Sequence, residues 1–94
     1  MEIVRASMVE ATAGREKGKP FFVLDADGDY LLLADGKSRR VEAPKRKKRK
    51  HVRFLGEGAG RVAEKIRGSE RVTNSELRRA IAAYGGTDKS DQEG

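Results

Sequence analysis

Glycine-containing turns divide the first half of the chain into short segments with the residue alternation of β-strands. Asp27-Gly28 and Asp35-Gly36 suit the positive φ angles of tight hairpin turns. Residues 14–19 are polar and form the tip of a longer first hairpin. We therefore expect five strands, over residues 7–13, 21–24, 30–34, 39–42 and 51–55.

Five short, consecutive strands favour a small closed barrel, because a flat sheet of this size would leave its edges exposed. The chain has 94 residues, of which 36% are hydrophobic, and no Trp, which suffices for one domain with a thin core. We expect a mainly β fold, with a five-stranded barrel over residues 1–56 and a two-helix appendage over residues 57–86. Most aromatic residues should pack in the core, and base stacking is left open for whichever of Phe21 and Phe22 faces outward.

The hydrophobic period becomes helical after the last expected strand, which predicts two helices. The first covers about residues 59–67 and stops at Gly68. The second is expected to end at Gly85-Gly86, and the polar tail over residues 87–94 is expected to be disordered.

The second helix begins with a complete capping signal. Thr73 can cap the first turn, and Glu76, three residues later, can reach back to the Thr73 backbone. Val72 and Leu77 occupy the positions of a hydrophobic staple.

Positive charge is concentrated in one part of the chain. Ten of the 21 Lys and Arg residues lie between residues 37 and 53, with Glu42 as the only acid among them, whereas the whole chain has a net charge of +6. Lys and Arg side chains this close together repel one another unless a polyanion neutralises their charge. The phosphate backbone of a nucleic acid is the most common such polyanion. The alternatives are a solvated loop without a partner and a membrane-surface patch, but residues 44–50 lack the bulky apolar side chains that membrane docking requires.

Patterns typical of catalysis are scarce. His51 is the only histidine, there is no cysteine, and neither a nucleophile elbow nor a phosphate-binding loop occurs. The acidic residues 25–29 suggest a calcium loop, but Gly28 and Gly36 fall at the wrong positions for an EF-hand. We expect a protein that is not an enzyme and that has no cofactor or metal. The absence of an apolar leader or membrane span predicts a soluble cytoplasmic protein.

The first hairpin carries the most informative pattern. An alternating strand is followed by Gly14, three charged residues, Gly18, Lys19 and a second apolar strand. The glycines permit positive φ and a close backbone approach to a partner, and Arg15, Lys17 and Lys19 surround them with charge. A tight turn without a ligand is the alternative. The segment resembles the KOW motif, with Gly18 at the place of its hallmark glycine.

The resemblance covers roughly residues 2–86. It includes Leu-Ala-Asp-Gly at 33–36, followed by Arg-Arg-Val at 39–41. It also includes Pro44 and Lys45 at the start of the basic run, which is residues 45–50, and the start of the second helix at 72–79. Together these resemble small bacterial KOW-domain RNA-binding proteins, a group similar to the archaeal and eukaryotic fourteen-e family of large-subunit ribosomal proteins. The resemblance implies an SH3-like barrel and a place on ribosomal RNA or on a ribosome precursor.

We therefore expect an RNA-binding protein, monomeric when free, that contacts large-subunit ribosomal RNA as a ribosomal component or a ribosome-associated factor. The expected RNA-binding residues are Gly14, Arg15, Lys17, Gly18, Lys19, Arg39, Arg40, Lys45, Arg46, Lys47, Lys48, Arg49, Lys50 and Arg53. The rival hypothesis is a protein-interaction KOW module of the transcription-elongation type that contacts RNA polymerase. Such a module would expose an apolar patch and would not need the six consecutive cations of residues 45–50.

Overall fold

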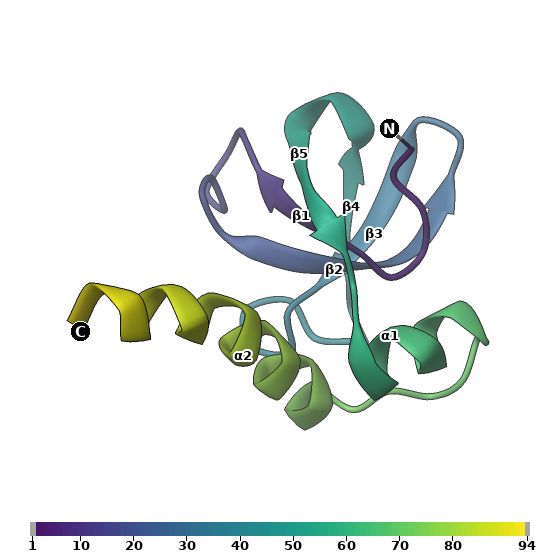
Figure 1. Ribbon diagram of the computed structural model, residues 1–94. Helices are drawn as coiled ribbons and strands as arrows, with labels where there is room; N and C mark the ends of the chain where they lie inside the picture. Colours follow the sequence, from purple (N-terminus) through teal and green to yellow (C-terminus); the bar gives the residue numbers. More distant parts are fainter. Residues whose placement is uncertain (1, 94) are drawn as a thin grey trace.

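Five antiparallel strands form one curled sheet, and two helices lie together beneath it (Figure 1). The computed structural model describes the backbone of residues 2–93 and the side chains of residues 2–84. The elements are β1 (Ser7–Ala11), β2 (Pro20–Asp27), β3 (Tyr30–Ala34), β4 (Lys45–Lys48), the 3₁₀ turn η1 (Arg49–His51), β5 (Val52–Glu57), α1 (Gly60–Arg67) and α2 (Asn74–Glu93). The strand order is β4-β3-β2-β1-β5. The expected mainly β fold, with five strands and two helices, is confirmed.

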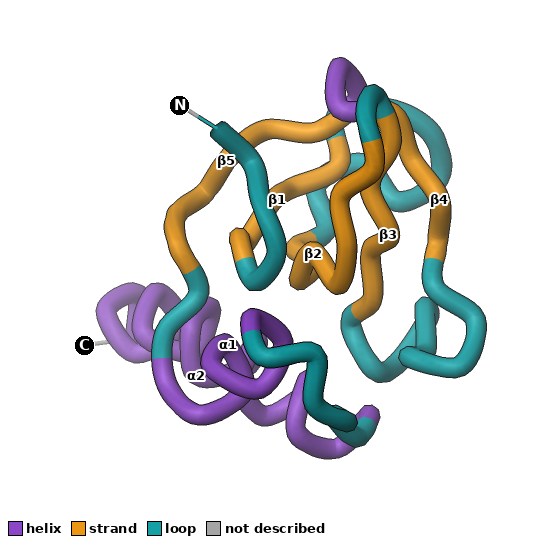
Figure 2. The backbone as a smooth tube through the Cα atoms, turned by 90° about the vertical axis from the view of Figure 1, so that its right-hand side faces the viewer, coloured by secondary structure: helices purple, strands orange, loops and turns teal. Residues whose placement is uncertain are grey.

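The two edge strands of the sheet, β4 and β5, are consecutive in the chain and are joined by η1 alone. The backbone N–H of Thr12, just after β1, donates to His51 O at 2.8 Å and so ties this turn to the first hairpin. Figure 2 shows the strands curving around a common interior, with both helices below them. The sheet is therefore barrel-like.

The fourth strand is not where the sequence predicts it, because residues 39–42 form a loop and β4 is the basic segment Lys45–Lys48. The Asp35 carboxylate accepts hydrogen bonds from Lys37 N at 2.9 Å and from Arg39 N at 2.8 Å, which closes a loop where a tight hairpin turn was expected. Val41 N then donates to Asn74 Oδ1 at 2.8 Å and not to a neighbouring strand.

The basic segment can form a strand because it lies at an edge of the sheet. There, alternate side chains remain in water and lysine is well tolerated. Three further strands have bounds that differ from expectation, since β1 ends at Ala11, β2 covers Pro20–Asp27 and β5 covers Val52–Glu57.

Alternating residues of β1, β2 and β3 separate the hydrophobic core into two clusters. The interior of the curled sheet holds Val9, Ala11, Phe21, Val23, Leu31 and Leu33. The other cluster joins the sheet to the helices and holds Ala6, Met8, Phe22, Ala34, Ala63, Ile66 and Leu77. Because Phe21 is 1% exposed and Phe22 is 2% exposed, both rings pack in the core and neither is free to stack on a base.

The capping signal at the start of α2 is present as predicted. Glu76 N donates to Thr73 Oγ1 at 3.1 Å, and Thr73 N donates to Glu76 Oε1 at 2.9 Å. Leu77 is fully buried, and Val72 packs against the same cluster, as expected for a hydrophobic staple. Local signals within the six residues 72–77 therefore fix both the start of the helix and the face that it buries.

The end of α2 differs from the prediction, because the helix runs past Gly85 and Gly86 to Glu93. Glycine weakens a helix by about 1 kcal/mol per residue relative to alanine but does not block helical geometry. The predicted disorder of residues 87–94 falls outside the residues whose side chains are described, and it stays a prediction. None of the helices in the described part of the chain combines the length and the apolar character needed to cross a bilayer.

Candidate nucleic-acid interface

The basic run has two faces because its first four residues form strand β4. Arg46 and Lys48 point outward and are exposed, Lys45 is half-buried, and Lys47 points inward. β4 is held in this register by pairing with β3, where Leu31 lies opposite Lys47 and Tyr30 lies opposite Lys48. Side chains alternate between the two sides of a strand, so the cations of β4 are divided between an outward and an inward side, although the sequence of the run is uniformly basic.

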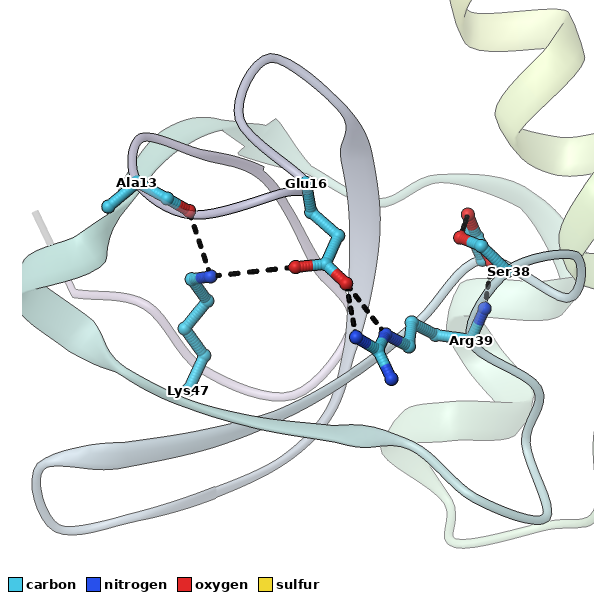
Figure 3. Close-up of polar contacts among 6 residues, drawn as sticks. Ala13, Glu16, Ser38, Arg39 and Lys47 are labelled. Carbon is cyan, nitrogen blue, oxygen red and sulfur yellow. Dashed lines mark hydrogen bonds and ion pairs between the residues drawn. The ribbon is translucent and has the colours of Figure 1, made fainter.

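Lys47 is part of the protein interior and not of an exposed surface. Its side chain is 9% exposed, and its Nζ donates to Ala13 O at 3.0 Å and lies 3.8 Å from Glu16 Oε1 (Figure 3). Arg39 also binds Glu16, through Nε at 2.9 Å and through a second, shorter bond from Nη2. This hydrogen bond from Arg39 is the main reason that the pKa of Glu16 lies below the ordinary value for a glutamate. Glu16 thus joins the hairpin tip to β4 and to the loop after β3.

Two other predicted site residues are also engaged within the protein. Arg49 donates from Nε to Gly28 O at 2.5 Å and from Nη1 to Ile3 O at 2.7 Å, so it fastens the N-terminal segment to the β2–β3 turn. Arg53 lies on β5 and forms an exposed ion pair with Glu10 of β1.

Most of the remaining predicted cations are exposed to solvent. Within the described part of the chain, no side-chain hydrogen bond or ion pair engages Arg15, Lys17, Lys19, Arg40, Lys45, Arg46, Lys48 or Lys50. All of these residues are exposed except the half-buried Lys45. They come from the hairpin tip, from the loop after β3, and from β4 with η1.

The hairpin tip lies against β4, although about thirty residues separate the two segments in the chain. The contact is made by Lys47, which bridges to Ala13 and faces Glu16. The tip and the basic run are therefore adjacent in the fold, with the inward side of β4 between them. This region, formed by residues 14–19 and 45–50, is called the basic face below.

Both glycines of the tip have the backbone conformation that the sequence predicts. Gly14 has φ 82° and Gly18 has φ 88°, a region that residues with a Cβ rarely adopt. Gly18 N donates to Ala11 O at 2.8 Å, which closes the hairpin. No atom lies within 4 Å of the position that a Gly18 Cβ would occupy, so the requirement for glycine there comes from the backbone and not from crowding.

Sequence reasoning missed two residues that organise this surface. Glu16 was counted only as one charge of the tip, yet it is the acceptor for Arg39 and the neighbour of Lys47. Most aromatic residues are expected in the core, but Tyr30 is half-buried, and Arg46 Cζ lies over its ring, 3.7 Å from the centre. The one signal for Glu16 in the sequence was its position as the only acid among the cations of the tip.

A comparison with models of known protein families gives no match, and neither does a comparison with curated proteins.

Proposed function

We propose that the protein is not an enzyme and binds RNA by placing phosphate groups on the basic face. The observation that carries this proposal is the division of the cations into two groups. Lys47, Arg49 and Arg39 have carbonyl or carboxylate partners inside the protein. The exposed cations of the basic face have no acidic partner in the described structure and repel one another until an external polyanion binds.

We further propose that the sheet is an SH3-like barrel of the KOW type and that the RNA is ribosomal RNA of the large subunit, in a ribosome or a precursor. Support for the KOW assignment comes from edge strands joined by a single 3₁₀ turn and from the positive φ of Gly18 in the tip. The ribosomal target rests on the sequence resemblance. Docking of a KOW module on RNA polymerase remains the rival proposal.

The phosphate contacts are testable through the salt dependence of binding. Replacing Lys17, Lys48 and Lys50 with Gln removes three exposed cations of the basic face and leaves in place the internal contacts of Lys47 and Arg49 and the Arg46 side chain over Tyr30. If all three contact phosphates, the log–log slope of affinity against salt should become shallower by about 2 to 3, at roughly 0.7 to 0.9 counterions per contact. Affinity should fall alike for unrelated RNA sequences, because phosphate contacts carry no sequence information.

The matched control removes the same charge at the helical end of the molecule. Arg61, Arg71 and Arg79 are exposed, and replacing them with Gln leaves the basic face intact. Anisotropy titrations at several salt concentrations should show a nearly unchanged slope for this control. Equal slopes for both triple variants would contradict the basic face as the binding surface.

The cellular target is testable by gradient sedimentation of a lysate at low and high salt. Co-migration with large ribosomal subunits at low salt, weakened at high salt, is the expected result. A free pool that co-purifies with RNA polymerase would favour the rival proposal.

A further inference from the structure

Tyr30 and Arg46 form a stacked pair on the outer side of β3 and β4. The strand register places Lys48 opposite Tyr30 and Arg46 opposite Leu32, so Arg46 is the diagonal neighbour of the Tyr30 ring. Arg46 Cζ lies 3.7 Å from the ring centre, and Lys48 Nζ lies 6.0 Å from it. The ring is held by the sheet, so a cation–π contact fixes the position of the Arg46 side chain at the edge of the protein.

A small pocket of about 190 Å³ opens beside this pair. It is lined by Asp25, Asp27, Tyr30, Leu31, Leu32 and Arg46. Asp25 is fixed in place, since its Oδ1 accepts from Ala26 N at 2.9 Å and from Arg5 Nε at 3.2 Å. The pocket therefore combines a stacking surface, aliphatic side chains and two carboxylates.

We propose that this pocket binds one unpaired nucleobase, stacked on the guanidinium of Arg46 that Tyr30 holds in place. The inference rests on the RNA-binding function proposed above and specifies how one nucleotide is held. Unpaired bases in RNA complexes commonly stack on aromatic side chains or on arginine planes. A phosphate does not suit this pocket, because the carboxylates of Asp25 and Asp27 repel it, whereas Lys48 beside the pocket attracts it. The base therefore enters the pocket and its phosphate lies on the basic face.

The carboxylates also favour one kind of base. An ionised carboxylate only accepts hydrogen bonds, so it pairs with an exocyclic amino group and not with a carbonyl oxygen. Cytosine carries such an amino group at the position where uracil carries a carbonyl oxygen. Uracil offers a carboxylate only its N3–H, which lies between two carbonyl oxygens that repel the carboxylate. The pocket should therefore prefer cytosine to uracil.

The test separates the charge of Arg46 from its planar shape. Arg46→Lys keeps the positive charge but removes the planar guanidinium that stacks. Lys50→Arg is the matched control, because it changes a nearby exposed cation that does not contact the Tyr30 ring. Anisotropy titrations would use oligocytidine and oligouridine of about ten nucleotides, together with a fully paired RNA of the same length.

The expected result is tighter binding of oligocytidine than of oligouridine by the unmodified protein. Arg46→Lys should weaken oligocytidine binding by about fivefold or more, the lower end of what loss of one stacked base causes, and should abolish the preference over oligouridine. Binding of the paired RNA should not change with Arg46→Lys, and Lys50→Arg should behave like the unmodified protein with all three RNAs.

Two outcomes would overturn the proposal. RNA binding with equal affinity for both oligonucleotides, or with no effect of Arg46→Lys, would remove the base pocket and leave phosphate binding by the basic face standing. Failure of the protein to bind any of the three RNAs would remove both this inference and the proposed function.

Discussion

Glu16 is the only acid in the tip of the first hairpin, and its side chain is 10% exposed. It accepts hydrogen bonds from Arg39, 23 residues away, and lies 3.8 Å from Lys47 Nζ. Two cations that the sequence assigns to RNA binding are therefore used to position the tip. At the scale of single residues, the charge available to a ligand is set by which cations already have a partner.

Replacing Glu16 with Gln should reduce the free energy of unfolding by about 1–3 kcal/mol, because Lys47 and Arg39 lose a charged acceptor in a largely buried place. Urea unfolding measures this change. Glu10→Gln is the control, since it removes an exposed pair with Arg53, and its cost should stay below about 1 kcal/mol. Equal costs for the two variants would show that the Glu16 contacts do not hold the tip.

Gly18→Val should impair binding in a different way from the loss of a cation. Its φ of 88° strains any residue with a Cβ by about 1–2 kcal/mol, and the tip should relax to another shape. Affinity for a folded RNA should fall while the slope of affinity against salt stays nearly constant, which titrations at several salt concentrations measure. Gly56→Val is the control, because that site in β5 has open space and no positive φ. Unchanged affinity of Gly18→Val would exclude the tip from the interface.

At the scale of elements, α2 is attached by its first turn. Thr73→Ala should lower the free energy of unfolding by about 1 kcal/mol through loss of the cap. Leu77→Ala should cost about 2–5 kcal/mol, since this side chain is fully buried between the sheet and the helices. Thermal and urea unfolding measure both, with the exposed Arg79→Ala expected within about 0.5 kcal/mol of the unmodified protein. An unchanged midpoint for Leu77→Ala would show that α2 does not stabilise the sheet.

The elements that the sequence predicts well are those whose signals are local. The box formed by Thr73 and Glu76 lies within four residues, and the alternation in β1 to β3 needs only neighbouring positions. β4 was missed because its strand character comes from pairing with β3, whereas residues 39–42 are diverted by Asn74, 33 residues away from Val41.

Prediction of the candidate site from the sequence was limited in the same way, to features that depend on residue type or on near neighbours in the chain. Exposed cations and positive-φ glycines were predictable from residue type. The partners of Lys47, Arg49 and Arg39 were not, because each is more than twenty residues distant in the chain.

At the scale of the whole molecule, carboxylates connect segments that are distant in sequence. Glu42 accepts hydrogen bonds from Asn74 Nδ2 at 3.0 and 3.1 Å, and Glu76 accepts one from Lys65 at 2.7 Å. These hydrogen bonds hold the pKa values of Glu42 and Glu76 below the ordinary value for glutamate. Burial raises the pKa of Asp35, but hydrogen bonds from the Arg39 and Lys37 backbone outweigh it and leave that pKa lowered as well.

Stability should therefore decrease in acid. A carboxyl group whose pKa is lower in the folded than in the unfolded state stabilises the fold at a pH above its unfolded pKa. The unfolded pKa is 4.5 for Glu and 3.8 for Asp. The stabilisation is lost as the pH falls through the folded pKa. The thermal midpoint should be nearly constant from neutral pH to about 5 and should drop steeply below about 4.5. Glu42→Gln should make the drop shallower, and a midpoint that rises on acidification would contradict these linkages.

The position of β4 at the edge of the sheet has a consequence for self-association. The outer side of an edge strand offers unpaired backbone groups on which a second chain can add a strand, and such addition leads to aggregation. In β4 every residue is Lys or Arg, so two copies that approach edge to edge repel each other. We therefore expect the cations of β4 to oppose such strand addition, and variants that neutralise them should become prone to association at high concentration in the absence of RNA.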